Sequence, residues 1–256
     1  MMIDVHNHIL VDVDDGAKSV EESILLLEQA KSEGVTDIVT TPHHLHPRYD
    51  NNIQVVKEKL EELRNNEIIK QLGINLYPGQ EIRVTDQIID DIHNGKIEGI
   101  NNSKYLLVEF PSNEVPHYSH KLFYELQNMG YVPIIAHPER NKAIAENLDI
   151  LFDLVNGGAL SQITSSSLLG DFGRKVKKIS LQMIDNNLTH FVASDAHSSS
   201  VRPFVMDKLF NERKLKTYYE DLESFMKNGK AVINDERISK HQPTQEYKQK
   251  KWFGLL

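Results

Sequence analysis

Short apolar segments alternate with longer segments of helical character along most of the chain. The apolar segments have the length of strands, and turn-forming residues separate them from the helical segments. We predict strands at 3–6, 37–41, 74–78, 105–110, 133–137, 160–164 and 190–194, and a last helix at about 206–227. Because alternation of strands and helices is typical of a parallel sheet, the pattern predicts an α/β fold.

Seven strand–helix units indicate a distorted TIM-like (β/α)7 barrel, which has one strand fewer than the TIM type. In such a barrel the carboxyl ends of all strands open on one rim, where the active site lies. No linker precedes the last helix, so we expect one barrel domain over residues 1–238. Residues 239–256 lack helical periodicity and form a basic and aromatic tail.

This tail carries four lysines and one glutamate, a net charge of +3, so the rest of the chain holds −11 of the total of −8. One interpretation is an arm that contacts an anionic membrane surface or a protein partner. The other is a tail that is disordered, or that packs Trp252 and Phe253 on its own domain. The sequence favours the second interpretation.

Composition narrows the class of protein. The 256 residues are 39% hydrophobic and 26% charged, as expected for a globular protein with a sizeable core. The chain has no cysteine, which excludes disulfides, zinc–thiolate sites and a thiolate nucleophile. The net charge of −8 argues against a broad nucleic-acid-binding surface. Neither a signal peptide nor a membrane-spanning segment is evident, so we expect a cytoplasmic protein.

The first predicted strand leads into the sequence HNHILVDVDD at 6–15, which is rich in metal-binding side chains. Alternation along a strand places His6 and His8 on one face, where both rings can approach one ion. Such a pair alone is more often structural than metal-binding. The aspartates could cap a helix, but Ser19 and Glu22 form a capping box for the next helix. Asp15 is therefore available for another role.

Histidine, aspartate or glutamate also lies at or just after the end of each remaining predicted strand except the sixth. The sixth strand offers only the amide and hydroxyls of QITSSS. We interpret this sixth segment as a polar lining or a cap for the next helix. A carboxylate at the end of an apolar strand is costly to bury without a compensating cation. Because the strand ends share one rim, we predict a multinuclear metal centre. Its candidate ligands are His6, His8, Asp15, His43, Glu81, Glu109, His137, Asp195 and His197. These imidazoles and carboxylates admit manganese, iron, cobalt or zinc.

The motifs HNH, TPHH, GQE, VEF, AHPER and ASDAH, in this order and spacing, resemble the PHP (polymerase and histidinol phosphatase) superfamily of metal-dependent phosphoesterases. Over residues 1–235 the chain looks most like the manganese-dependent protein-tyrosine phosphatases of bacterial capsule and exopolysaccharide clusters. The resemblance implies the seven-stranded PHP barrel and three Mn²⁺ ions. It assigns the first ion to His6, His8, Glu81 and Asp195, the second to Glu81, Glu109 and His137, and the third to Asp15, His43 and His197.

The resemblance also implies an activity. The protein would hydrolyse phosphotyrosine on a bacterial tyrosine kinase that regulates polysaccharide synthesis, through water activated by the metals. Arg140 lies within the motif AHPER and Arg202 follows ASDAH closely, so both can reach phosphate oxygens with their guanidinium groups. The alternative for each is a surface salt bridge, which is the weaker interpretation for Arg140. The kinase would be the partner, nucleic acid would not be bound, and membrane contact would occur only through the tail or the kinase.

Two other functions stay open at this point. The superfamily also contains small-molecule phosphatases such as histidinol phosphatase, and a non-enzymatic module could act as a scaffold for the kinase. His44 and His46 add to the density of histidines beside His43, and we expect them to have loop or supporting roles.

Overall fold

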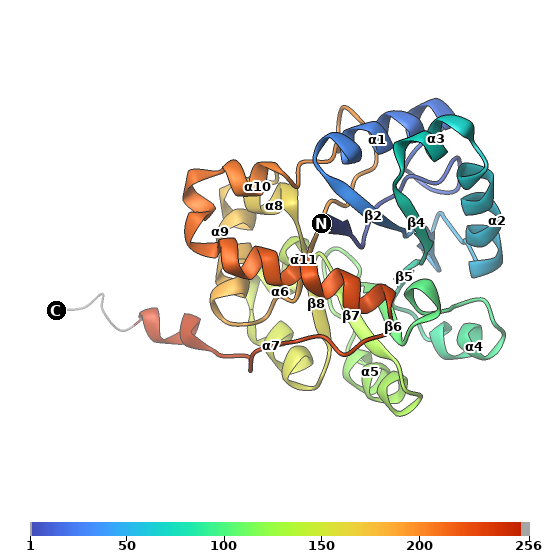
Figure 1. Cartoon of the computed structure of the whole chain (residues 1–256). Helices are drawn as coiled ribbons and strands as arrows, with labels where there is room; N and C mark the ends of the chain where they lie inside the picture. Colours follow the sequence, from blue (N-terminus) through green and yellow to red (C-terminus); the bar gives the residue numbers. More distant parts are fainter. Residues whose placement is uncertain (1, 252–256) are drawn as a thin grey trace.

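The computed structural model describes residues 2–251, with side chains described through Lys248. Its strands pair only in parallel and form two sheets (Figure 1). The first sheet has the order β1 (Met2–Asp4), β2 (Val35–Thr40), β4 (Asn75–Pro78). The second has the order β3 (His43–His44), β5 (Glu81–Arg83), β6 (Tyr105–Glu109), β7 (Val132–Ala136), β8 (Leu160–Thr164), β9 (Phe191–Ala193).

The predicted α/β class with parallel strands is confirmed, and all seven predicted strands are present with ends shifted by up to two residues. The second and third predicted strands are each followed by a further short strand that the pattern does not predict. β2 ends at Thr40 and the chain resumes as β3 at His43, after Pro42, which lacks the N–H that a continuous ladder needs. β4 ends at Pro78 and resumes as β5 at Glu81. The described strands therefore form two sheets in place of one closed barrel.

The segment after β1 lies between the two sheets and connects their edges. The N–H of Asp195 donates to the carbonyl of His6 at 2.8 Å, and the N–H of His8 donates to the carbonyl of Ala196 at 2.8 Å. Below this point, the buried carboxylate of Asp4 accepts hydrogen bonds from the N–H and the hydroxyl of Ser194, at 2.8 and 2.6 Å. These bonds bring the carboxyl end of β9 beside the first histidines of the chain.

Helices surround the sheets (Figure 1). The α-helices are α1 (Val20–Ser32), α2 (Ile53–Arg64), α3 (Glu67–Leu72), α4 (Ile88–His93), α5 (Ser119–Asn128), α6 (Lys142–Glu146), α7 (Asp149–Asn156), α8 (Ser165–Leu169), α9 (Arg174–Asp185), α10 (Lys208–Asn211) and α11 (Tyr219–Ile233). Short 3-10 helices are η1 (Ile100–Asn102), η2 (Pro138–Arg140), η3 (Arg213–Tyr218) and η4 (Glu246–Lys251). No helix within residues 2–251 combines the length and the apolar character that crossing a membrane requires.

The capping of α1 is confirmed in part. The hydroxyl of Ser19 accepts a hydrogen bond from the N–H of Glu22 at 3.3 Å, as a helix cap does. The Glu22 carboxylate accepts the N–H of Lys18 at 2.6 Å, so the reciprocal bond of the predicted capping box is replaced.

The last helix does not span 206–227 as predicted. α10 and η3 occupy the first part of that range, and α11 continues to Ile233 because its last turns are buried. A Cβ on Gly229 would lie 3.2 Å from Ile3, so the helix approaches β1 closely at this glycine. Val232 also joins the core inside the strands.

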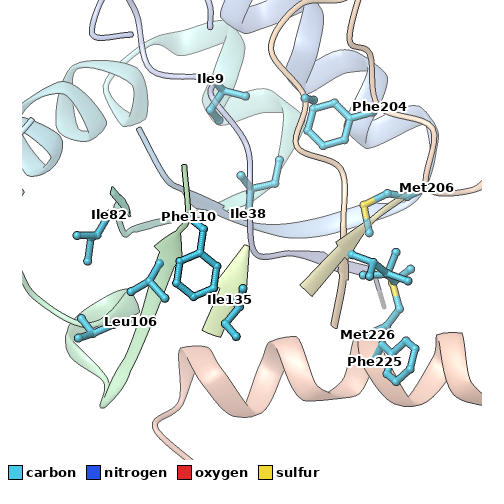
Figure 2. Packing of buried hydrophobic residues seen from close by; sticks show 14 of the residues in the cluster. Ile9, Ile38, Ile82, Leu106, Phe110, Ile135, Phe204, Met206, Phe225 and Met226 are labelled. Atoms are coloured by element: carbon cyan, nitrogen blue, oxygen red, sulfur yellow. The ribbon is translucent and has the colours of Figure 1, made fainter. Parts of the chain in front are cut away.

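Alternating strand residues fill two apolar regions. Leu107 and Ile134 belong to the core inside the strands, whereas their neighbours Leu106 and Ile135 pack between strands and helices. Figure 2 shows Leu106 and Ile135 in this second region, which extends to Met226 of α11. The two regions fix the position of each strand, and thus of the polar residues at the strand ends.

The tail packs on its own domain as far as Lys248. The N–H of Thr244 donates to the carbonyl of Asn186 at 2.9 Å, and the hydroxyl of Tyr247 donates to Asp149 at 2.6 Å. The amine of Lys248 lies 2.9 Å from the same carboxylate. Trp252 and Phe253 lie outside the described residues.

We expect Tyr247→Phe to lower the free energy of unfolding by about 1 kcal/mol, because it removes the hydrogen bond to Asp149 without changing the ring. Urea unfolding measures the change. Tyr124→Phe is the matched control, since Tyr124 is 66% exposed and its loss of a hydroxyl should have no effect. Equal stability of the two variants would contradict a stabilising role for this contact.

Stability should also depend on the charge of Glu33, which ends α1. Burial raises the pKa of its carboxyl from 4.5 to about 7, even though the carboxyl accepts the N–H of Met206 at 2.7 Å. The folded protein thus binds this proton more tightly than the unfolded chain. The resulting stabilisation is complete below about pH 4.5 and is lost as the pH rises through about 7.

We expect Glu33→Gln to remove this decrease of stability with pH. The pH-dependent change in the free energy of unfolding that Glu33 causes should not exceed about 1 kcal/mol, because solvent screens a partly exposed group. Urea unfolding of both proteins across this pH range tests the prediction. Glu28→Gln, an exposed position on the same helix, is the control. Parallel pH profiles of wild type and Glu33→Gln would be evidence against the role of Glu33.

Candidate metal centre

A cavity of about 290 Å³ lies at the carboxyl ends of the strands, where the sequence predicts the site. Seven of the nine predicted ligands line it, namely Asp15, His43, Glu81, Glu109, His137, Asp195 and His197. The other two, His6 and His8, are buried beneath it. Arg140 and Arg202 line the same cavity. The structure thus brings together every side chain that the sequence proposes for the site.

The deepest group of side chains contains His6, His8, Glu81 and Asp195. The two Nε2 atoms of the histidines lie 3.3 Å apart. The Oε2 atom of Glu81 lies 3.4 Å from Nε2 of His6 and 3.3 Å from Nε2 of His8. From the Oδ1 atom of Asp195, the distances are 3.4 and 3.5 Å. Four potential ligand atoms therefore face one another.

Glu81 joins this group to a second one. Its Oε1 atom lies 2.7 Å from Nε2 of His137, whereas its Oε2 atom faces the deepest group. Nε2 of His137 also lies 3.8 Å from Oε1 of Glu109. The two oxygens of Glu81 point to different groups, which is the arrangement of a bridging carboxylate.

Asp15 is at the centre of a third group, nearer the surface. Its Oδ1 atom lies 3.4 Å from Nε2 of His43 and 3.6 Å from Nε2 of His197. A ring nitrogen of His8 lies within 4.8 Å of the ligand atoms of this group. A ring nitrogen of His43 lies within 4.8 Å of a carboxylate oxygen each of Glu81 and Glu109. Within the described part of the chain, the three groups therefore share histidines that the resemblance assigns to one ion each.

Two residues that the sequence analysis did not select orient the deepest histidines. Nδ1 of His8 donates to Asp14 at 2.7 Å, and Nδ1 of His6 donates to Gln162 at 2.8 Å. These bonds leave the Nε2 atoms facing the centre, as partners of metal-binding histidines commonly do. Gln162 lies in the sixth predicted strand. At the end of that strand the hydroxyl of Thr164 accepts the N–H of Ser167 at 3.3 Å, so the interpretation of this segment as a cap for the next helix is confirmed. Nothing in the sequence distinguishes Asp14 from Asp15.

Three arginines place positive charge around the groups. Arg140 and Arg202 each direct a terminal nitrogen to Oδ2 of Asp195, at 2.6 and 2.5 Å. Arg83, which the sequence analysis did not select, lies 2.9 Å from Glu109. Burial opposes the charge of Asp195, but Arg140, His6 and Arg202 hold the pKa of its carboxyl well below the usual range.

Several buried polar atoms of this site make no hydrogen bond. Among the described side chains, Nδ1 of His43 and one carboxylate oxygen each of Glu81, Glu109 and Asp195 are buried without a hydrogen bond. Two of these oxygens lie beside a positive or polar group, since Nδ1 of His43 is 2.9 Å from Oε2 of Glu81 and Arg83 is 2.9 Å from Oε2 of Glu109. Buried polar atoms usually have partners in folded proteins. Burial and the charge of Glu81 raise the pKa of Glu109 to about 7. The donor set, with a buried oxygen of Asp195 that makes no hydrogen bond, fits divalent cations.

His44 and His46 have the supporting positions that we expected. His44 is buried, with its ring nitrogens 2.9 Å from Asp50 and 3.3 Å from Asp91. The ring of His46 stacks on His43 with centroids 4.7 Å apart, so it helps to hold that ring in place.

The family model for capsular polysaccharide synthesis, CpsB/CapC, matches residues 2–234. The chain belongs to the CpsB/CapC family. The resemblance that the motifs indicated is thereby confirmed at the level of this family.

Individual members of the CpsB/CapC family are similar over the whole chain. CapC of Staphylococcus aureus is 71% identical over 255 residues, covering 100% of both chains. Tyrosine-protein phosphatase YwqE of Bacillus subtilis (strain 168) is 40% identical over 255 residues, again covering 100% of both chains. A crystal structure from work on YwqE and on CpsB of Streptococcus pneumoniae, described as unique metal-dependent tyrosine phosphatases, matches with a TM-score of 0.90 and 40% identity. The match covers 95% of this chain and 98% of that chain.

Proposed function

We infer that this protein is a metal-dependent tyrosine-protein phosphatase of capsular polysaccharide synthesis. The observation that carries this inference is the cluster of imidazole and carboxylate ligand atoms beside Arg140 and Arg202. Full-length relatives named tyrosine-protein phosphatases support it. Because the chain has no cysteine, a thiolate nucleophile is excluded, which agrees with a metal-dependent route.

We propose that the nine side chains hold three Mn²⁺ ions, with Glu81 shared between two of them. The first set is His6, His8, Glu81 and Asp195; the second is Glu81, Glu109 and His137; the third is Asp15, His43 and His197. The choice of manganese and the number of ions come from the family resemblance, since the donor set also suits iron, cobalt or zinc. When bound, such ions lower the pKa of a coordinated water and neutralise phosphate oxygens.

Arg140 and Arg202 are proposed to bind the non-bridging oxygens of the phosphate. Their guanidinium groups line the cavity and meet at one oxygen of Asp195, so both can reach a phosphoryl group bound there. The leaving group of phosphotyrosine is a phenolate, whose conjugate acid has a pKa of about 10. It therefore departs with less need for a general acid than an alkoxide does.

The substrate is proposed to be a phosphotyrosine of the kinase that regulates capsular or extracellular polysaccharide synthesis. The description of the family as one of capsular polysaccharide synthesis supports this choice. The cytoplasmic location and the domain boundary at 238 stay predictions. We also propose that the two sheets constitute a distorted seven-stranded barrel, which the hydrogen bonds between the ends of β1 and β9 support.

The test compares catalytic efficiencies of the manganese-loaded protein on a tyrosine phosphopeptide, on the matching serine phosphopeptide and on histidinol phosphate. We expect the tyrosine phosphopeptide to be the best substrate by a wide margin. A preference for histidinol phosphate would favour a small-molecule phosphatase instead. Absence of hydrolysis with any of the three, in protein that retains its metal, would overturn the proposal and favour a scaffold.

A further inference from the structure

An exposed phenylalanine stands at the edge of the candidate metal centre. Phe172 is 41% exposed, and its ring centroid lies 5.1 Å from the guanidinium carbon of Arg140, within the range of a cation–π contact. The turn that carries it is tight, because the N–H of Gly173 donates to the carbonyl of Gly170 at 2.8 Å. Both glycines have positive φ, 99° and 92°, which other residues rarely adopt. The backbone thus holds an apolar ring outside the cavity beside a phosphate-binding residue.

Exposed basic residues follow this ring along the chain. α9 begins at Arg174, and it packs against η2, the element that contains Arg140. Residues 171–178 contain four basic residues and one acid, in a chain whose net charge is −8. Arg174, Lys175 and Lys178 are exposed, and among the described side chains none of them forms an ion pair. Cations in the first turn of a helix oppose its dipole, so helix stability does not explain them.

A second exposed apolar residue adjoins Arg202, which lines the cavity. Val201 is 83% exposed and precedes Arg202. The hydroxyl of Ser198 accepts hydrogen bonds from the N–H groups of both residues, at 3.0 and 3.2 Å, which fixes the turn. Exposed apolar residues are ordinary when scattered. Here, however, one stands next to each of the two arginines that converge on Asp195.

We propose that Phe172, Val201 and the basic face of α9 form a docking surface for an acidic peptide segment around the phosphotyrosine. The cavity of about 290 Å³ accommodates the phosphorylated side chain, so the residues that flank it in a protein must lie on the rim. The apolar rim residues would contact the peptide near the tyrosine. Arg174, Lys175 and Lys178 would attract acidic flanking residues. The proposal rests on the phosphatase function proposed above and adds the class of sequence that the site prefers.

The experiment uses the manganese-loaded full chain and three substrates. Two are tyrosine phosphopeptides with acidic or neutral flanking residues, and the third is 4-nitrophenyl phosphate, which does not reach the rim. We expect the double variant Lys175→Glu/Lys178→Glu to lose about tenfold in kcat/KM on the acidic peptide, mainly through KM. Its rate on 4-nitrophenyl phosphate should stay within about twofold of wild type. This substrate has no flanking residues that the lysine charges could attract. The wild type should prefer the acidic peptide and lose this preference at high salt.

Lys227→Glu is the matched control, because Lys227 is exposed on α11 near Met2 and Gly34, at the opposite ends of the strands. It should leave all three substrates unchanged. Val201→Ser tests the apolar part and should raise KM for both peptides only. An equal loss on 4-nitrophenyl phosphate and on the acidic peptide would overturn the proposal, as would unchanged peptide kinetics. Absence of any hydrolysis by the wild type would instead contradict the proposed phosphatase function.

A membrane is the other anionic surface that such a basic face could contact. Co-sedimentation with vesicles that contain anionic lipid separates the two possibilities. Vesicle binding that the double variant abolishes, together with unchanged kinetics on the acidic peptide, would assign the surface to a membrane and overturn the peptide proposal. We expect no vesicle binding by the wild type, and a lower kcat/KM of the double variant on the acidic peptide.

Discussion

Asp195→Asn should reduce kcat/KM on a tyrosine phosphopeptide by about 10³-fold, the combined effect of a lost metal ligand and of misplaced phosphate-binding groups. One oxygen of Asp195 lies 3.4 and 3.5 Å from the ring nitrogens of His6 and His8. The other lies within 2.6 Å of both Arg140 and Arg202. An amide has the same shape but no negative charge, and its NH₂ group would face either a cation or a guanidinium group.

Elemental analysis of the metal content, together with steady-state kinetics, tests this prediction. We expect less bound metal per chain, and a loss of rate that added manganese does not fully restore. Asp90→Asn is the matched control, since Asp90 is exposed on α4, and it should behave as wild type. Full metal content and normal activity of Asp195→Asn would show that this carboxylate is not part of the centre.

Asp14→Asn is expected to weaken metal binding by about 10- to 100-fold, although Asp14 is not a proposed ligand. Its buried carboxylate accepts hydrogen bonds from Nδ1 of His8 at 2.7 Å and from the N–H of His43 at 3.1 Å. Burial opposes the negative charge, but the charge of His8 and their hydrogen bond lower the pKa of Asp14 to about 2. An asparagine in its place would leave the imidazole less basic and less firmly oriented.

Calorimetric titration of metal-free protein with Mn²⁺ measures this effect. At saturating metal, kcat should recover to near the wild-type value, because Asp14 acts through His8 and does not contact the substrate. Asp12→Asn makes the same chemical change at an exposed residue of the same loop, and it should leave the affinity unchanged. If Asp14→Asn lowers thermal stability while the metal affinity stays at the wild-type level, Asp14 has only a structural role.

The fold class and the nine candidate ligands could be predicted from the sequence alone, whereas Asp14, Gln162 and Arg83 could not. Strand–helix alternation predicts parallel strands, and parallel strands place all their carboxyl ends on one side. A histidine or carboxylate that ends a strand must therefore lie near the others. This inference needs only local periodicity, which is why all nine predicted side chains converge at the cavity or directly beneath it.

The orientation of the side chains depends on contacts between distant parts of the chain, and it is visible only in the tertiary structure. Gln162 is 156 residues from the His6 ring that it orients, and only the pairing of sheets brings the two together. Asp14 and Asp15 are equivalent neighbours in the sequence, but the loop directs Asp14 inward to His8 and Asp15 to the cavity. The true extent of α11 also follows from packing that no local pattern records. The side chains of a site can be predicted from local order, whereas their orientation is set by long-range packing.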